Sequence, residues 1–260
     1  PEEFVSHIPC AQDGSVNGCQ HLSMMGRDQT GALATNCTAN DERFDLYMEV
    51  ADAVMVILKR DAERCAVSDE WFKRLEGDAA KSRKVVKRAV MTTPYGVTDK
   101  GIATQLVNDK HCNDFTSASR LDASLVMTNA ILESMSKVNG KGVKIMEYFQ
   151  TVAVVLARQG LPLTWFTPMG LKVTQGYYNT SRKKVVTILG QFDLRVESSD
   201  LGLDASKQAL SSAPNVIHSF DAAMLQMTVA RLAEKGLKDY AMIHDSYGVH
   251  ACDTETLNTV

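Results

Sequence analysis

Residues 240–251 read YAMIHDSYGVHA, and two short apolar segments in this stretch flank the polar group His244-Asp245-Ser246. Short apolar segments on either side of a polar turn predict two short β-strands. A second acidic turn lies near the start of the chain, where Asp13-Gly14-Ser15 follows an extended segment over residues 4–11. Both ends of the chain therefore carry an aspartate in a turn beside a predicted strand.

Most of the chain between these two turns is helical in pattern. Apolar residues recur at helical spacing, and Pro94 stops a basic helix because proline cannot continue one. Asn40 and Asp41 are expected to cap a long helix over residues 44–58. The other expected helices cover residues 20–36, 78–93, 121–135, 143–158, 203–212 and 218–235.

Strand-like segments interrupt the helical pattern once, in the second half of the chain. β-Branched and aromatic residues dominate residues 163–167, 171–178 and 183–196, with turn residues between them, and predict the strands of a hairpin. A helical middle between two strand-associated ends predicts a helix-rich α+β fold.

Composition excludes several classes of protein. With 260 residues, 45% of them hydrophobic, the chain suits one large domain or two small ones. Its apolar stretches fall far short of the roughly 20 residues that cross a bilayer, and the N-terminus carries no basic-then-apolar leader, so neither membrane insertion nor secretion is expected. Six scattered cysteines favour reduced thiols, and Cys19-x-His21 has no partner pair that would complete a zinc site.

Charge is concentrated in one segment. The formal net charge of the chain is −3, yet residues 81–100 contain six basic residues and one acidic residue. Arg83, Lys87, Met91 and Tyr95 are spaced by four, which places them on one helical face until Pro94 interrupts it. Guanidinium and ammonium groups on one face suit a triphosphate, although a solvated basic face is the simpler alternative.

The aspartates of the two turns are candidate metal ligands. Mg²⁺ prefers carboxylate oxygens, takes one or two from the protein and fills its other positions with water and substrate phosphate. Asp13 and Asp245 on adjacent strands could hold two such ions, one to activate an attacking hydroxyl and one to steady a leaving pyrophosphate. By spacing alone, two ordinary surface aspartates are the simpler explanation of this pattern.

Four segments, in this order, resemble motifs of the single-subunit (bacteriophage and mitochondrial-type) DNA-dependent RNA polymerases. The first and last resemble palm motifs, the second resembles the fingers motif, and the third is a further landmark of the family. They are Asp13-Gly-Ser-Val-Asn-Gly-Cys-Gln-His21 with Gly26-Arg-Asp28, residues 83–96, Pro214-Asn-Val-Ile-His218-Ser-Phe-Asp221, and His244-Asp245-Ser-Tyr-Gly248. The likeness covers nearly the whole chain.

The resemblance implies a role for each matching residue. Asp13 and Asp245 would bind two Mg²⁺ ions, with the Gly14 carbonyl as an extra ligand. Arg83 and Lys87 would bind the incoming triphosphate, and Lys87 would also protonate the departing pyrophosphate. The nucleotide's ribose would contact Tyr95 and His218, and the RNA 3′ end would contact His244. The reaction implied is attack of the RNA 3′-hydroxyl on the α-phosphate of a ribonucleoside triphosphate.

The resemblance also implies a division of the chain. Residues 1–66 and 203–260 would be palm segments, and residues 67–202 would be fingers, including the basic helix over 78–93. Residues 171–196 would correspond to the hairpin that enters the promoter major groove in this family. Its expected tip carries Asn179, Arg182, Lys183 and Lys184, which suit phosphate or base-edge contacts, although an exposed hairpin with a basic turn is an equal alternative.

Partners and compartment follow from the same resemblance. The partners would be template and promoter DNA, nascent RNA and ribonucleoside triphosphates, with no membrane. Relatives carry an N-terminal region and a thumb that have no counterpart in these residues, so we expect little or no RNA synthesis by this chain alone. A phage or prophage enzyme in a bacterial cytoplasm is favoured over one of the mitochondrial matrix.

Two departures and two rival functions remain open. Pro94 stands where many relatives have a helix-compatible residue, and this proline is expected to change how Tyr95 moves. Val16 stands where relatives often have a cysteine. A related DNA polymerase would carry an acidic residue soon after the first aspartate, and residues 14–19 contain none. A catalytically incompetent nucleic-acid-binding prophage remnant would bind DNA without binding nucleotide in a Mg²⁺-dependent way.

Overall fold

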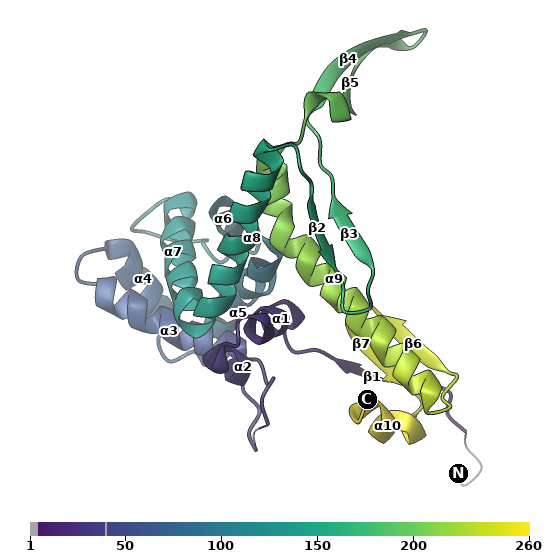
Figure 1. Cartoon of the computed structure of the whole chain (residues 1–260). Helices are drawn as coiled ribbons and strands as arrows, with labels where there is room; N and C mark the ends of the chain where they lie inside the picture. Colours follow the sequence, from purple (N-terminus) through teal and green to yellow (C-terminus); the bar gives the residue numbers. More distant parts are fainter. Residues whose placement is uncertain (1–4, 40) are drawn as a thin grey trace.

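The computed structural model describes residues 5–39 and 41–260 (Figure 1). It confirms the helix-rich α+β fold. The helices are α1 Asn17–Met25, α2 Gln29–Ala34, α3 Leu46–Asp61, α4 Ala66–Leu75, α5 Ala79–Thr92, α6 Asp99–Asn108, α7 Arg120–Val138, α8 Gly140–Arg158, α9 Ala205–Glu234 and α10 Thr254–Asn258. The strands are β1 Cys10–Asp13, β2 Leu163–Phe166, β3 Lys172–Gln175, β4 Thr180–Thr187, β5 Gly190–Glu197, β6 Tyr240–Ile243 and β7 Ser246–Val249.

The two ends of the chain meet in one antiparallel sheet with β7 at its centre. β1 pairs with β7, so that Asp13 lies opposite Ser246, and β6 pairs with the other edge of β7. His244, with φ of +56°, forms the tight turn between β6 and β7 together with Asp245. The sheet therefore brings the first and last acidic turns of the chain side by side.

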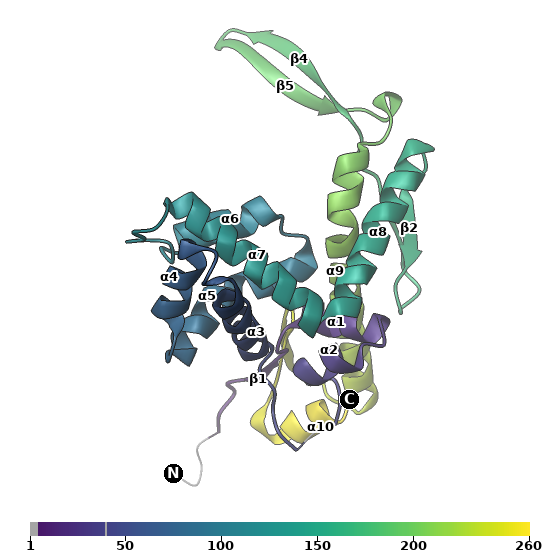
Figure 2. The same ribbon diagram turned by 90° about the vertical axis from the view of Figure 1, so that its left-hand side faces the viewer.

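The largest hydrophobic core lies among helices α3 to α7. Leu58, Trp71, Ile102, Met127 and Ile131 are fully buried in it. The Trp71 indole Nε1 donates a hydrogen bond to the carbonyl of Ala123 at 2.8 Å, which ties α4 to α7. In the turned view this helical block lies to the left of α8 and α9 (Figure 2).

Helix α9 links the sheet to the rest of the molecule. Two smaller cores lie along it: Leu22 and Met146 pack against Ala213 and Ile217 of α9, and Leu232 packs against the sheet and α10. The helix is continuous through Pro214, so the separate helices expected over residues 203–212 and 218–235 are wrong. A proline removes one hydrogen-bond donor, and the packing on both sides of α9 compensates for that loss.

Two other helix boundaries differ from the expectation. The helix expected over residues 20–36 is split into α1 and α2 at Gly26, Arg27 and Asp28, where Arg27 has φ of +46°. The long helix α3 begins at Asp45, whose side chain accepts hydrogen bonds from the backbone N–H groups of Tyr47 and Met48, so Asp41 is not its cap. Asn40, and Phe4 of the expected extended segment, lie outside the described residues.

The helix expected over residues 121–135 is present as α7, but not all of its large apolar side chains are buried. Leu121 and Leu125 are exposed, whereas Met127 and Ile131 are buried. The buried stripe of α7 also contains small residues such as Ala123 and Ser124, which let α4 and α3 approach closely. A pattern that counts only large apolar residues misses such a stripe.

Residues 163–197 form two hairpins, not the single one expected. β2 pairs with β3, and β4 pairs with β5 in a hairpin that projects from the body beyond the end of α9 (Figures 1 and 2). The segment 183–196 contains its own turn at Ile188 and Leu189, followed by Gly190 with φ of +132°. Ile188 and Leu189 are therefore the tip, and Arg182, Lys183 and Lys184 lie along β4 instead.

No helix within residues 5–39 and 41–260 combines the length and apolar character required to span a lipid bilayer.

Candidate active site

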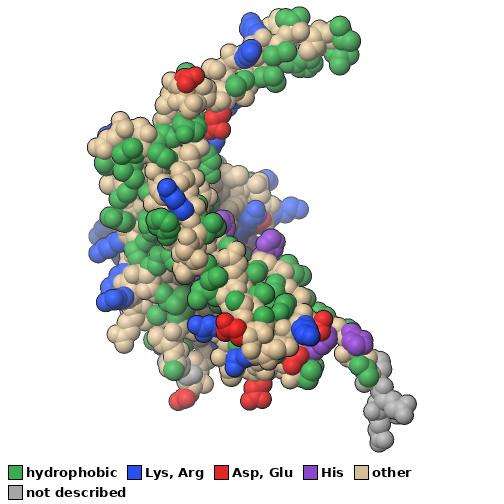
Figure 3. Space-filling model, turned by 45° about the vertical axis from the view of Figure 1, so that its right-hand side comes forward, with side chains coloured by type: hydrophobic (Ala, Val, Ile, Leu, Met, Phe, Trp, Pro, Cys, Tyr) green, Lys and Arg blue, Asp and Glu red, His purple; other side chains and the backbone are tan. Residues whose placement is uncertain are grey.

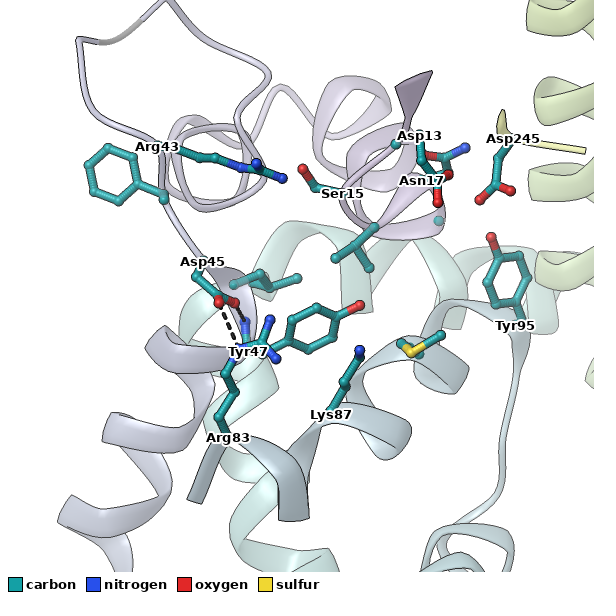
Figure 4. Close-up of a pocket in the computed structure, with 16 residues that line it drawn as sticks. Asp13, Ser15, Asn17, Arg43, Asp45, Tyr47, Arg83, Lys87, Tyr95 and Asp245 are labelled. Carbon is teal, nitrogen blue, oxygen red and sulfur yellow. Dashed lines mark hydrogen bonds and ion pairs between the residues drawn. The ribbon is translucent and has the colours of Figure 1, made fainter. Parts of the chain in front are cut away.

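A cavity of about 690 Å³ lies where the sheet, α1, α3 and α5 meet (Figure 4). Of the residues singled out in the sequence, it brings together Asp13, Gly14, Arg83, Lys87, Tyr95 and Asp245. These residues come from segments up to 232 residues apart, so only the fold makes them neighbours. His218 and His244 do not line the cavity. His218 stacks on Tyr95, which does, and His244 directly precedes Asp245 in the turn.

The two aspartates share one edge of the sheet. Asp13 is the last residue of β1 and pairs with Ser246, the residue directly after Asp245. Paired residues on neighbouring antiparallel strands lie about 5 Å apart at Cα, so both carboxylates reach the same space. Figure 4 shows them pointing into the cavity from β1 and from the β6–β7 turn.

The geometry fits a hard cation that is held partly by the protein. Within residues 5–39 and 41–260 no group of three or more histidine, cysteine, aspartate or glutamate side chains gathers in the way a closed metal cage requires. Two carboxylates and a nearby Gly14 carbonyl in an open cavity are the donor set that Mg²⁺ accepts when water and phosphate supply its other ligands.

Asn17 is a cavity residue that the sequence pattern did not single out. Its side chain lies beside Asp13 in Figure 4 and is 8% exposed. A Cβ atom added at Gly14 would fall 1.7 Å from the Asn17 Oδ1 atom, so the glycine makes room for this amide. Residue 14 therefore has no space for a side chain while Asn17 keeps this position.

Helix α5 presents two cations to the cavity. Arg83 and Lys87 line it, one turn apart, whereas Lys84 and Arg88 project elsewhere, and Arg88 pairs with Asp109 at 2.7 Å. No acidic side chain in the described part of the chain forms an ion pair with Lys87. The Lys87 ammonium is thus free to meet an anionic ligand.

The start of α3 also lines the cavity, through Leu46 and Tyr47. The sequence pattern did not single out Tyr47 as a site residue. The Tyr47 ring lies 5.0 Å from the Arg83 guanidinium carbon and 5.8 Å from the Lys87 Nζ atom. Burial, followed by the nearby Cys19, raises the pKa of Tyr47, so its phenol stays neutral at ordinary pH. An aromatic face near two cations contributes a favourable cation–π attraction.

Tyr95 is held between two helices at the end of α5. It closes the short 3₁₀ turn Thr93–Tyr95, and its ring stacks on His218 of α9 with centroids 4.7 Å apart and planes 16° apart. Burial raises the pKa of Tyr95 to about 12, and Asp221 and Asp245 contribute in the same direction. The phenol therefore keeps its proton and can donate a hydrogen bond.

Glycines on both sides allow this placement of Tyr95. A Cβ atom at Gly18 of α1 would lie 2.6 Å from the Pro94 Cβ atom and 3.2 Å from the Tyr95 Cζ atom. Gly96 has φ of +76°, and a Cβ atom there would lie 3.0 Å from the Leu210 carbonyl oxygen. Pro94 therefore fits its surroundings by packing against a helix that lacks a side chain at this point.

Replacing Gly96 with Ala is expected to lower the free energy of unfolding by about 2–3 kcal/mol. A left-handed backbone costs an L-residue about 1–2 kcal/mol, and the contact with Leu210 adds to that. Urea denaturation followed by circular dichroism measures the loss. Gly77→Ala is the matched control, because Gly77 has φ of +78° but no atom within 4 Å of the added Cβ. Equal losses in both variants would contradict a close approach at Gly96.

A part-buried pair joins α1 to α9 outside the cavity lining. The His21 Nε2 atom lies 2.8 Å from the Asp221 Oδ1 atom, and the side chains are 9% and 18% exposed. Both residues belong to quoted motifs, but neither was assigned a role. The pair fixes α1, which carries Asn17, against the helix that carries His218.

The basic residues of the projecting hairpin do not join this site. Arg182, Lys183 and Lys184 lie on β4, far from the sheet along α9 (Figure 1). Arg182 and Lys184 share one face of the hairpin, and Lys183 lies on the other because side chains alternate along a strand.

The sequence and fold resemble those of polymerases. All 260 residues match the sequence model of a family described as DNA-dependent RNA polymerase. DNA-directed RNA polymerase 1, mitochondrial, of Arabidopsis thaliana is 35% identical over 264 residues, and the match covers all of this chain and 27% of the relative. DNA-directed RNA polymerase 2A of Nicotiana tabacum is also 35% identical over 264 residues, covering all of this chain and 78% of that relative. The chain thus spans little more than a quarter of the Arabidopsis protein.

A solved structure supports the fold assignment. The POL domain of Pol1 from M. smegmatis, in complex with DNA primer-template and dNTP, aligns with a TM-score of 0.51 and 15% identity. The alignment covers 98% of this chain and 36% of that chain. Identity at this level shows a shared fold.

Proposed function

This chain belongs to the family of DNA-dependent RNA polymerases, and from that premise we propose that its cavity adds ribonucleotides to the 3′ end of an RNA strand on a DNA template. The observation that carries this proposal is the convergence of Asp13, Asp245, Arg83, Lys87 and Tyr95 on one open cavity. The cavity offers carboxylates for cations, cations for phosphates and a phenol for a sugar.

Asp13 and Asp245 would hold two Mg²⁺ ions, with the Gly14 carbonyl as a further ligand. When bound, such ions neutralise charge on the phosphates and favour the ionised form of an attacking hydroxyl. The contribution of the chain itself is to fix both carboxylates on paired strands, so that neither has to be reorganised during the reaction. Asn17 restrains the Asp13–Gly14 turn, since its amide fills the space beside Gly14.

Arg83 and Lys87 would bind the triphosphate of the incoming nucleotide. The guanidinium can donate two parallel hydrogen bonds to phosphate oxygens, and the ammonium acts as a mobile point charge. Because no acidic side chain in the described residues pairs with Lys87, its ammonium can approach the departing pyrophosphate, which it would protonate. Positioning and charge neutralisation are the main sources of rate in such a transfer.

Tyr95, His218 and His244 would contact the sugars. Tyr95 and His218 present stacked rings beside the carboxylates, and the protonated phenol of Tyr95 suits a hydrogen bond to a ribose hydroxyl. His244 precedes Asp245 in the turn and would lie beside the RNA 3′ end. Ribose selection is the property that separates this function from DNA synthesis.

Replacing Tyr95 with Phe is expected to reduce the preference for ATP over dATP by about threefold to tenfold, the effect of one neutral hydrogen bond. Equilibrium binding of both nucleotides in the presence of Mg²⁺ measures the ratio. Tyr148→Phe on α8 is the matched control, since Tyr148 is exposed outside the cavity. A wild-type chain that prefers dATP would point to the DNA polymerase alternative.

The prophage-remnant alternative differs from the polymerase proposal in what it predicts for Mg²⁺-dependent nucleotide binding. A chain that binds DNA but shows no Mg²⁺-dependent nucleotide binding would be a nucleic-acid-binding remnant. The intact set of cavity residues favours the polymerase.

The β4–β5 hairpin would contact DNA through the face that carries Arg182 and Lys184. Cross-strand pairing places Arg195 and Asp193 opposite them, so this face is mixed in charge with a basic excess. The other face carries Phe192 and Leu194 beside Lys183, and hydrophobic side chains continue to the tip (Figure 3).

The double substitution Arg182→Ala and Lys184→Ala is expected to weaken duplex DNA binding and to lower the slope of log affinity against log salt by about 2, one unit for each phosphate that is no longer neutralised. Titration with duplex DNA at several KCl concentrations gives the slope. Lys183→Ala is the comparison, because Lys183 lies on the opposite face. An unchanged slope in the double variant would exclude DNA contacts by this face.

The remaining assignments belong to the same proposal. Residues 1–66 and 203–260 would be palm segments and residues 67–202 fingers, although α3, just before that boundary, packs with α5 and α7. Promoter DNA and nascent RNA would be partners of the complete polymerase. The bacterial cytoplasm of a phage or prophage host and the mitochondrial matrix are the two candidate compartments.

A further inference from the structure

Asp45 uses its two carboxylate oxygens for two different contacts. Its Oδ1 atom accepts hydrogen bonds from the backbone N–H groups of Tyr47 at 2.9 Å and Met48 at 3.4 Å, which begins helix α3. Its Oδ2 atom accepts a hydrogen bond from the Arg83 Nε atom at 2.7 Å (Figure 4). The carboxylate is therefore oriented by α3 and in turn orients a side chain of α5.

The contact with Asp45 leaves the phosphate-binding end of Arg83 available. Only the Nε atom meets Asp45, and no other acceptor in the described residues forms a hydrogen bond with this guanidinium. The Tyr47 ring, 5.0 Å from the guanidinium carbon, supports its face. Asp45 thus contacts the Nε edge of the Arg83 guanidinium, and the Tyr47 ring lies against its face. The two terminal nitrogens remain for a bidentate contact with phosphate.

Two effects of Asp45 on an anionic ligand oppose each other. Its negative charge repels a triphosphate, so by Coulomb's law alone its removal should tighten binding. Its hydrogen bond, however, restricts a long side chain that would otherwise lose conformational freedom when the ligand binds. Arg83 and Asp45 are 36% and 37% exposed, so solvent screens the repulsion. The geometric effect should therefore prevail.

We propose that Asp45 is a positioning residue for triphosphate recognition, which acts by holding Arg83 with its terminal nitrogens toward the cavity. This role rests on the proposed function of Arg83 and Lys87 as the triphosphate site.

Binding of inorganic tripolyphosphate to the 260-residue chain, measured by calorimetry without metal, tests the proposal. The variant Asp45→Asn keeps a good helix cap but removes the carboxylate. We expect it to weaken binding by about fivefold to tenfold, the cost of ordering one long side chain. Asp52→Asn, an exposed carboxylate two turns along α3, removes the same charge and should not weaken binding.

A double-mutant cycle separates positioning from a general effect on folding. In an Arg83→Lys background the Nε contact no longer exists, so Asp45→Asn should have no further weakening effect. The Nε–H resonance of Arg83 in the NMR spectrum, identified by its loss in Arg83→Lys, should also disappear in Asp45→Asn. These readouts do not depend on catalysis.

The possible outcomes distinguish the positioning role of Asp45 from the proposed triphosphate site of Arg83 and Lys87. If the wild-type chain binds tripolyphosphate, and Arg83→Ala weakens binding while Asp45→Asn leaves it unchanged or tightens it, only the positioning role is overturned. If the wild-type chain does not bind, or if Arg83→Ala and Lys87→Ala bind as well as wild type, the triphosphate site is refuted and the role of Asp45 falls with it.

Discussion

Replacing Asp245 with Asn is expected to weaken Mg²⁺-dependent binding of a ribonucleoside triphosphate by more than about 100-fold, because even residues that only support a metal ligand contribute about 10- to 100-fold. Asp245 and Asp13 are the two carboxylates at the shared edge of the sheet. An amide has the same shape as the carboxylate but no charge, so it cannot neutralise a divalent ion. The effect should appear only when Mg²⁺ is present.

Calorimetric titration of ATP, with and without Mg²⁺, measures this difference. Asp239→Asn is the matched control, since Asp239 precedes β6 at the far end of the same sheet, is exposed and does not line the cavity. Circular dichroism should show both variants folded. A folded Asp245→Asn chain that binds Mg²⁺·ATP as tightly as wild type would contradict a metal-binding role for this residue.

Replacing Lys87 with Ala is the second large effect, with an expected loss of about 10- to 150-fold in ATP affinity. A hydrogen bond to a charged group contributes about 1.5–3 kcal/mol, which corresponds to that range. The Lys87 ammonium lines the cavity, and among the described residues no acidic side chain neutralises it. Its whole charge is therefore available to the ligand.

Lys84→Ala serves as the control for this prediction. Lys84 lies on the same helix, one turn before Arg88, but does not line the cavity. Both variants remove one positive charge from α5, so a general electrostatic effect would weaken ATP binding equally. Equal affinities in the two variants would mean that α5 acts as a basic surface without a defined triphosphate site.

The sequence predicted much of the cavity because its chemistry lies in short segments. Arg83 and Lys87 are four residues apart, and helical geometry alone puts them on one face. Asp13 and Asp245 each lie beside a strand, so a shared sheet was enough to bring them together. Those residues could be found from local patterns plus the resemblance of four motifs.

Asp45 and Tyr47 could not be found in this way. Both residues contact α5, across 38 residues of chain in the case of Asp45 and Arg83. The sequence also offered Asn40 and Asp41 as earlier capping candidates, which moved the expected start of α3 away from Asp45. Capping residues are common in loops, and only packing decides which of them begins a helix.

The projecting hairpin shows a different limit. Residues 183–196 look like one strand because the turn at Ile188 and Leu189 contains two apolar residues, and only Gly190 marks a change of direction. Hairpin prediction depends on recognising the turn, and an error there moves every side chain relative to its partner. Arg182 and Lys184 were consequently placed at a tip that is hydrophobic in the structure.

We propose that the cavity binds divalent ions between Asp13 and Asp245, near the two ends of the chain. The most direct measurement replaces Mg²⁺ with Fe²⁺ in the presence of ATP and maps where locally generated hydroxyl radicals cut the backbone. Cuts next to Asp13 and next to Asp245, both abolished in Asp245→Asn and both suppressed by excess Mg²⁺, are the predicted result. Cuts elsewhere in a folded chain, or cuts that persist unchanged in the variant, would contradict the claim.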